Sequence, residues 1–226
     1  MANYNRNQIK TAVLIDGSFF LKRYRCLYEN GGNHSPEEIV INLNSMIRKH
    51  IADEYLYRVF YYDCPPFDQK IYNPYTNKTI DFNKSETAIF RKNFFNELKK
   101  QRKFALRLGK IRQTRRWILK PDTLKDVLQE KTQIEELTDN DFVYDLQQKG
   151  VDIKIGIDIA SLAIQRMVNK IILISGDSDF VPAAKLARRN GIDFLLDPMW
   201  NPIRPDLFEH IDGLQSNCPK PQHMKE

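Results

Sequence analysis

The sequence predicts a three-layer α/β/α domain in which helices cover both faces of a mostly parallel central sheet. Apolar runs of strand length recur along the chain, segments with helical spacing of apolar residues lie between them, and short turns join the two. Strands that alternate with helices favour parallel pairing, because each helix crosses over the sheet to reach the next strand. At 226 residues, 42% of them hydrophobic, the chain is long enough to bury a substantial core.

The first half of the chain supplies two strands and two helices. Residues 11–15 form a continuous apolar run that ends in Asp-Gly, as expected for a strand buried on both faces. A helix begins after Ser35, because a serine cap, a proline in the first turn and Glu38 three residues on form a capping box. Its apolar residues follow at helical spacing. Residues 57–62 predict the second strand, and residues 85–100 predict the second amphipathic helix.

The second half is less uniform. Alternating apolar and basic residues indicate extended structure over residues 104–108 and 115–119, whereas the acidic, weakly patterned residues 121–150 are expected to form helix and loop. The remaining elements are expected to be a helix over 153–168, a buried strand over 171–175, a helix over 180–189 and a last strand over 192–196. We expect a single domain over residues 1–214 and a flexible, proline-containing tail over 215–226.

Positive charge is concentrated in one stretch of the chain. The net charge is +6, but residues 99–120 contain 10 basic and no acidic side chains, which indicates a basic insertion that binds a polyanion such as nucleic acid. The side chains expected to contact nucleic acid are Arg107, Lys110, Arg112, Arg115, Arg116 and Trp117, with Phe104 as a second stacking surface. A solvated hairpin face is the alternative interpretation of the same pattern.

Several classes of protein are excluded by what the sequence lacks. Its three cysteines are widely spaced and form no Cys-x-x-Cys pair, which argues against a disulfide framework and a cysteine zinc site. No apolar run approaches the length needed to cross a bilayer, and no Gly-x-Gly-x-x-Gly follows a strand. We therefore expect a cytoplasmic protein with no membrane partner and no nicotinamide cofactor.

Aspartates follow two of the predicted strands. Asp16 ends the first strand, and Asp177 and Asp179 follow the strand over 171–175. Because the carboxyl ends of parallel strands form the ligand crevice of an α/β sheet, these side chains are expected to meet. Asp158 lies in an apolar helix, where a buried carboxylate needs a counter-charge, and Asp152 at the start of that helix can reach the same place.

Three of these aspartates also have a purely structural interpretation. The Asp-Gly at residue 16 is typical of a turn, Asp179 can cap the following helix, and Asp158 can face outward. Converging carboxylates, however, repel one another and need a cation. Hard oxygen ligands suit Mg²⁺ or Mn²⁺, which can supply a hydroxide nucleophile and neutralise charge on a phosphodiester. Asn201 and Arg204 are further candidates to line the crevice, although their spacing gives no firm signal.

The same residues resemble the NYN branch of the PIN-like nucleases, in particular its bacterial LabA-like members. The resemblance covers residues 11–197 and rests on the strand followed by Asp16, on Lys-Gly-Val-Asp at 149–152 with Asp158, and on Ile-Ser-Gly-Asp-Ser-Asp-Phe at 174–180. It implies a PIN-like (Rossmannoid) fold and metal-dependent phosphodiester cleavage. The implied catalytic and metal-binding residues are Asp16, Asp158, Asp177 and Asp179, supported by Asp152, Ser18 and Ser175. Many relatives have asparagine where this chain has Ser18, and we expect Ser18 to supply the missing polar contact.

The preferred hypothesis is therefore a divalent-metal-dependent ribonuclease that cleaves RNA through an aspartate cluster, with an endoribonuclease as the expected type. Single-stranded DNA is the alternative substrate, and the sequence leaves self-association open. A second hypothesis is a non-catalytic nucleic-acid-binding or regulatory module on the same fold. A phosphatase or Toprim-type domain is disfavoured, because Asp16 has no second aspartate two residues later and the first strand ends in Asp rather than Glu.

Overall fold

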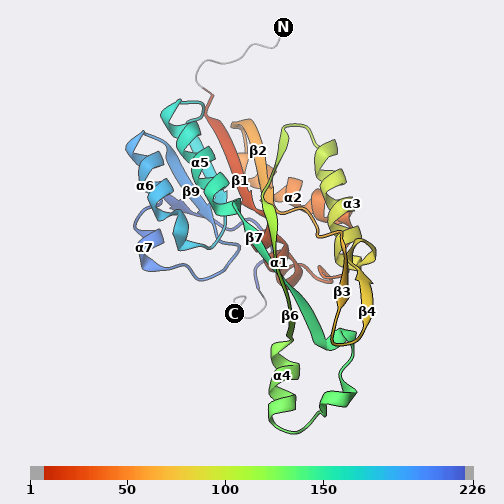
Figure 1. Cartoon of the computed structure of the whole chain (residues 1–226). Coiled ribbons are helices and arrows are strands. Elements are labelled where there is room, and N and C mark those ends of the chain that lie inside the picture. The colour runs from red at the N-terminus through yellow and green to blue at the C-terminus, as the bar shows by residue number, and fades with distance from the viewer. Residues whose placement is uncertain (1–7, 222–226) are drawn as a thin grey trace. The chain divides into compact units, whose positions relative to one another are not determined.

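The computed structural model describes residues 8–221, which form two compact units (Figure 1). The core unit runs up to Asp63 and continues over Asn93–Gly109 and from Gly150 onward. The inserted unit comprises Cys64–Lys92 and Lys110–Lys149. Each unit is thus assembled from separate stretches of the chain. No helix among residues 8–221 has the length and apolar character that a membrane span requires.

The core unit is built on a six-stranded sheet in the order β10-β9-β8-β1-β2-β5, and every strand pair in it is parallel. The strands are β1 (Lys10–Asp16), β2 (Tyr55–Asp63), β5 (Phe104–Leu108), β8 (Lys170–Ile174), β9 (Asp193–Asp197) and β10 (Gly213–Leu214). In the centre of the sheet, Ile15 lies opposite Tyr61 on one side and Ile174 on the other. The register therefore brings the carboxyl ends of β1 and β8 to the same edge.

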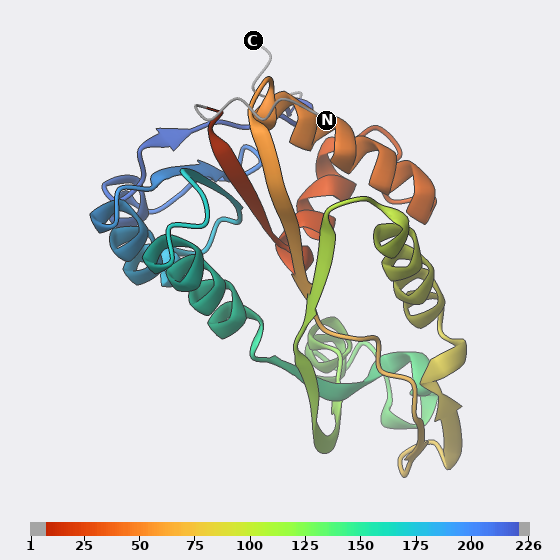
Figure 2. The same ribbon diagram turned by 90° about the horizontal axis from the view of Figure 1, so that it is seen from above.

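Helices cover both faces of this sheet (Figure 2). The helices α1 (Gly17–Leu27) and α2 (Pro36–Ile51) lie on one face, and α5 (Val151–Ile164) and α6 (Val181–Arg189) lie on the other. The part of α3 (Glu86–Lys100) from Asn93 onward belongs to the core unit, as does the short α7 (Pro205–Phe208). The predicted three-layer α/β/α class with its parallel sheet is confirmed.

Continuous burial explains why the central strands consist of unbroken runs of apolar residues. Residues 12–15 of β1 and 171–174 of β8 are all 0% exposed, since each strand has helices above and below it. The capping box predicted for α2 is present: Ser35 N donates to Glu38 Oε2 at 2.7 Å, and Glu38 N donates to Ser35 Oγ at 3.3 Å. Together these features fix β1, β8 and α2 in the positions that the sequence pattern predicts.

The inserted unit contains two antiparallel strand pairs. The first pair is β3 (Lys70–Asn73) with β4 (Lys78–Asp81), and the second is β6 (Lys110–Leu119) with β7 (Phe142–Lys149). Between β6 and β7 the chain forms α4 (Pro121–Leu128) and two single 3-10 turns, η2 (Ile134–Glu136) and η3 (Asp139–Asp141); a further turn, η1 (Phe82–Lys84), precedes α3. The helix-and-loop prediction for residues 121–150 was therefore wrong over β7, whose residues, exposed or half-buried except for Tyr144, give a weak apolar pattern.

The basic stretch is divided between the units. Residues 104–108 form β5 at the edge of the core sheet, whereas residues 110–119 form β6 of the inserted unit. Both strands were predicted to belong to a single basic insertion, because both contain arginine or lysine next to apolar residues.

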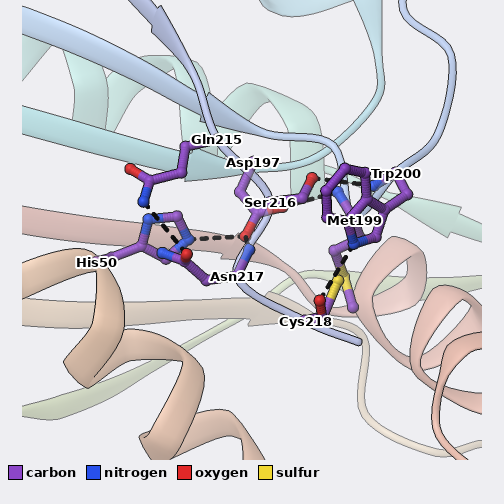
Figure 3. Close-up of polar contacts among 8 residues, drawn as sticks. All are labelled: His50, Asp197, Met199, Trp200, Gln215, Ser216, Asn217 and Cys218. Atoms are coloured by element: carbon purple, nitrogen blue, oxygen red, sulfur yellow. Dashed lines mark hydrogen bonds and ion pairs between the residues drawn. The ribbon is translucent and has the colours of Figure 1, made fainter. Parts of the chain in front are cut away.

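The segment after β10 contacts the core unit through a buried polar cluster (Figure 3). His50 on α2 and Asp197 at the end of β9 lie 2.7 Å apart between Nε2 and Oδ2, and both side chains are 0% exposed. Asp197 Oδ1 also accepts from Met199 N at 2.7 Å, and Trp200 donates to Ser216 Oγ and to the carbonyl of Cys218. Ser216 and Cys218, in the stretch predicted to be a tail, thus contact the loop after β9. Residues 222–226 of that predicted tail lie outside the described residues.

Candidate active site

Asp16 is held at the junction between β1 and α1. It is the last residue of β1 and the N-cap of α1, and its Oδ1 accepts from Phe19 N at 3.1 Å and from Ser18 Oγ at 3.0 Å. A β-carbon on the next residue, Gly17, would lie 2.5 Å from the Tyr61 ring, so glycine is required for α1 to begin this close to β2. The predicted contact of Ser18 is therefore with Asp16 itself.

Asp177 and Asp179 occupy the turn after β8. Ser175 Oγ accepts from Asp177 N at 3.3 Å, and Asp177 Oδ1 accepts from Asp179 N at 3.0 Å, which caps the 3-10 turn η4 (Ser178–Phe180). A β-carbon on Gly176 would lie 2.8 Å from the Phe19 ring, so this turn packs directly against the start of α1. The two aspartate-bearing strand ends therefore meet, as the sequence predicts.

A hollow of about 430 Å³ opens between these two strand ends. Its lining residues are Asp16, Ser18, Phe19, Lys22, Ser175, Gly176, Asp177, Ser178 and Asn201. Lys22 was not singled out by the sequence, although it lies four residues after Ser18 and hence on the same face of α1. Within the described part of the chain, its ammonium group has no hydrogen bond or ion pair with another residue. The hollow thus combines two carboxylates with one cation.

Two carboxyl groups at or near the hollow, Asp16 and Asp152, have pKa values raised above the ordinary range. Burial raises the pKa of Asp16, and the hydrogen bonds from Phe19 and Ser18 only partly oppose that shift. The pKa of Asp152, in the first turn of α5, is also raised, first by burial and then by the charges of Asp16, Asp177 and Asp179. The charge of Asp152 is therefore coupled to those of Asp16, Asp177 and Asp179.

Asp158 lies in a different environment. Arg107 on β5 donates to both of its carboxylate oxygens, from Nη2 to Oδ1 at 2.8 Å and from Nε to Oδ2 at 2.9 Å, and Tyr62 Oη donates to Oδ2 at 2.7 Å. Burial, together with the carboxylate of Asp158, raises the pKa of Tyr62 above its ordinary value, so the phenol stays protonated and donates. The counter-charge expected for this carboxylate is thus an arginine of the same unit.

The donor set suits a hard divalent cation, but its side chains do not form a closed cage. Oδ2 of Asp16 and Oδ2 of Asp177 accept no hydrogen bond from residues 8–221, so each has an oxygen left for a ligand. Over these same residues, no three or more His, Cys, Asp or Glu side chains are gathered closely enough to hold a metal by themselves. The fit is therefore to an ion such as Mg²⁺, which is commonly held by one or two carboxylates and keeps several waters.

Comparison with known protein families decides the wider relationship. The NYN domain matches residues 10–200, a range that includes every aspartate described above. The chain belongs to the NYN domain family. This NYN domain has the PIN-like nuclease fold; NYN domains are generally nucleases, and PIN-like nucleases typically use divalent metals. The match identifies the family and not the LabA-like branch within it, which stays a prediction.

Other comparisons add only a general likeness. A crystal structure of a protein of unknown function from Vibrio parahaemolyticus resembles this NYN domain with a TM-score of 0.48 and 14% sequence identity, over 94% of each chain. No curated protein matches the sequence.

The residues expected to bind nucleic acid are distributed over both units of this NYN domain. Arg107 belongs to the core unit and pairs with Asp158. The others lie on β6 of the inserted unit: Lys110, Arg112, Arg115, Arg116 and Trp117. The four cationic side chains on β6 are exposed, and Trp117 is half-buried. Arg107 is therefore accounted for by an internal ion pair, whereas the cations of β6 face solvent.

Asp16→Asn is expected to raise the midpoint of thermal unfolding by a few degrees at pH 7. Asparagine keeps the N-cap acceptor but removes a charge that burial disfavours. Because the folded pKa of Asp16 lies above 3.8, the folded state binds more protons than the unfolded state between the two values. The charge of Asp16 therefore lowers stability progressively as the pH rises through that window.

Calorimetry at several pH values measures this effect. The advantage of the variant should shrink as the pH falls toward 3.8. Asp193→Asn, at the opposite end of β9 and beside Lys170, is the control and should not gain stability. An Asp16→Asn protein less stable than wild type at pH 7 would contradict the electrostatic account of the cluster.

Proposed function

We propose that this protein is a divalent-metal-dependent ribonuclease that hydrolyses phosphodiester bonds within RNA chains. The observation that carries the proposal is the convergence of Asp16 and Asp177 on one hollow, with Asp152 and Asp179 close enough to act on the same charges. Membership of the NYN domain family supports nuclease chemistry at this position.

The roles of the acidic residues follow from their contacts. Asp16 and Asp177 each present one oxygen to the hollow while the other is fixed by the chain, so we assign them as the principal ligands of Mg²⁺ or Mn²⁺. Asp179 adds negative charge beside them. When bound, the cation would neutralise charge on the scissile phosphate and lower the pKa of a bound water.

Two further groups act on the substrate directly in this proposal. Lys22 contributes a cation to the lining of the hollow and is placed to hold a phosphate oxygen. Asp152, whose pKa is raised by burial and by its acidic neighbours, is suited to accept the proton that the attacking water loses. Ser18 and Ser175 keep the ligands in position through their hydrogen bonds.

We assign Asp158 a positioning role in place of the ligand role implied by the resemblance. A carboxylate that accepts two hydrogen bonds from Arg107 and one from Tyr62 is already neutralised. It therefore ties α5, which carries Asp152, to β2 and β5 of the sheet.

A non-catalytic nucleic-acid-binding module is the second candidate. Two observations favour it: no three acidic side chains among residues 8–221 are gathered as a ready metal site, and β6 presents a row of exposed cations. In that case RNA would bind with a strong dependence on salt and would never be cleaved.

The decisive experiment is an incubation of wild-type protein with linear RNA, circular RNA and matched single-stranded DNA in Mg²⁺, Mn²⁺ or EDTA. Cleavage of RNA with either metal and none with EDTA is the expected result. Cleavage of the circle is expected too, because a circle has no ends and is opened only by an endonuclease. Salt-sensitive binding without product under every condition would contradict the ribonuclease and support the binding module.

A further inference from the structure

The inserted unit contains a cavity of about 650 Å³, within the size range of ligand pockets. The aromatic side chains that line it are Phe67, Phe82, Trp117, Phe142 and Tyr144. Of all the lining residues only Ala88 and Tyr144 are buried; the others remain half-buried or exposed. An apolar cluster of this size normally closes on itself, because packed interiors leave few voids. The rings therefore line an open space that a ligand can fill.

Two of the aromatic rings, those of Trp117 and Tyr144, are held by hydrogen bonds to residues outside the cavity lining. Trp117 Nε1 donates to the Tyr72 carbonyl at 3.0 Å, and Tyr144 Oη donates to Gln113 Oε1 at 3.2 Å. The centroids of the Trp117 and Tyr144 rings are 5.2 Å apart, and Phe67 stacks on Tyr144 at 5.8 Å. Because their polar atoms are already bonded, these side chains offer the cavity mainly fixed ring surfaces, which suit a flat aromatic ligand.

Polar groups at the cavity can recognise the edge of such a ligand. The side-chain amides of Asn140 and Gln148 both line it, and neither forms a hydrogen bond to any residue in the range 8–221. An amide carries both donors and an acceptor, as the edge of a nucleobase requires. Asp139 also lines the cavity, but Lys78 and the side chains of Asn73 and Thr76 already engage its carboxylate.

The surrounding charge favours a polyanion. Lys120 lines the cavity, and residues 110–120 contain five basic and no acidic side chains. A purely apolar peptide or lipid could pack against the rings but would form no interaction with the amides or with these cations. A base with its phosphate uses all three.

We propose that this cavity binds one unpaired nucleobase of a single-stranded nucleic acid, with the adjoining phosphates held by Lys120 and the cations of β6. The ligand class rests on the proposed function, but the site is separate from the acidic hollow and contains none of its residues. Bound this way, the base is unstacked from its neighbours, so the cavity selects single strands over duplexes.

Thr87→Trp is the direct test, because Thr87 is an exposed lining residue in the first turn of α3 and a large ring there fills the cavity without leaving a void. Ile89→Trp adds the same ring on the same helix at an exposed residue that does not line the cavity. Dissociation constants are measured in EDTA at fixed salt for a labelled oligouridylate and for its abasic analogue, which keeps the phosphates but lacks bases. Circular dichroism checks that both variants fold.

Thr87→Trp is expected to weaken binding of the oligouridylate about tenfold, whereas Ile89→Trp should bind it as wild type does. Neither variant should change binding of the abasic strand. Gln148→Ala, which alters only an exposed amide, should also weaken binding of the base-bearing strand alone and keeps the test valid if Thr87→Trp misfolds. The proposal would be overturned if Thr87→Trp and Gln148→Ala both bind the oligouridylate with wild-type affinity. It would also be overturned if the variants lose equal affinity for the base-bearing and abasic strands. Either result would indicate another occupant of the cavity, such as an apolar peptide.

Cleavage assays in Mg²⁺ and Mn²⁺ separate this inference from the proposed function. If wild type cleaves RNA and both cavity variants bind it as wild type does, the nuclease proposal would be supported and the base pocket would be contradicted. Base-dependent binding that the cavity variants reduce, without cleavage by wild type, would support the pocket and contradict the nuclease.

Discussion

Asp177→Asn is expected to lower the rate of RNA cleavage at least about 100-fold, since removing one of the proposed ligands of the cation would cost several kcal/mol of transition-state stabilisation. Asparagine keeps the Oδ1 that accepts from Asp179 N, so η4 should still form. The fold should therefore survive a change that removes the charge. Single-turnover cleavage of labelled RNA, together with circular dichroism, measures both parts of this expectation.

Asp193→Asn is the matched control for that variant. It makes the same chemical change at an exposed aspartate of the neighbouring strand β9, at the opposite end of the sheet, and its activity should equal that of wild type. Full activity in Asp177→Asn would remove this residue from the mechanism. Activity lost only through unfolding would equally count against the assignment.

Asp197→Ala is expected to lower the free energy of unfolding by about 2–5 kcal/mol, because each buried hydrogen-bonding group left without its partner costs about 1–3 kcal/mol. The change leaves the fully buried His50 without its 2.7 Å partner and leaves Met199 N without its acceptor (Figure 3). Urea unfolding followed by circular dichroism gives the free energy.

Lys100→Ala provides the comparison. It breaks an exposed pair with Glu97 on α3, where solvent screens the charges, and the unfolding midpoint should stay close to that of wild type. If Asp197→Ala were as stable as Lys100→Ala, the buried pair of His50 and Asp197 would contribute no more to stability than an exposed pair does.

Local sequence pattern was sufficient to predict the central elements of the fold. β1 and β8 were predicted because strands covered on both faces need apolar residues at every position. Helix α2 was predicted because all the residues of its capping box lie within one short stretch of the sequence. Helix α1 was not predicted, because it begins directly at the end of β1 with only Asp16 as its cap. The pairing of β6 with β7 also depends on contacts distant in sequence, which no local pattern encodes.

The candidate site was predictable to the same extent. The rule that parallel strands end at one edge located Asp16, Asp177 and Asp179 correctly near one another. It could not separate Asp152 from Asp158, because both lie on α5 and only the position of Arg107 shows that Asp158 is already paired. The cavity beside β6 likewise depends on residues of β7 and of the segment before α3. The sequences of these segments do not indicate that they line a cavity.

The register of the central sheet also constrains the order in which this chain can fold. β1 is synthesised first, yet one of its two partners is β8, and Thr11 lies opposite Lys170. Contacts so distant in sequence slow folding, and until β8 emerges the nascent chain exposes the apolar edge of β1, a surface prone to aggregation. Asp177 arrives with β8, so a ribosome-bound fragment carries Asp16 without its partner carboxylate. Closure of the sheet and assembly of the acidic hollow are therefore one late event.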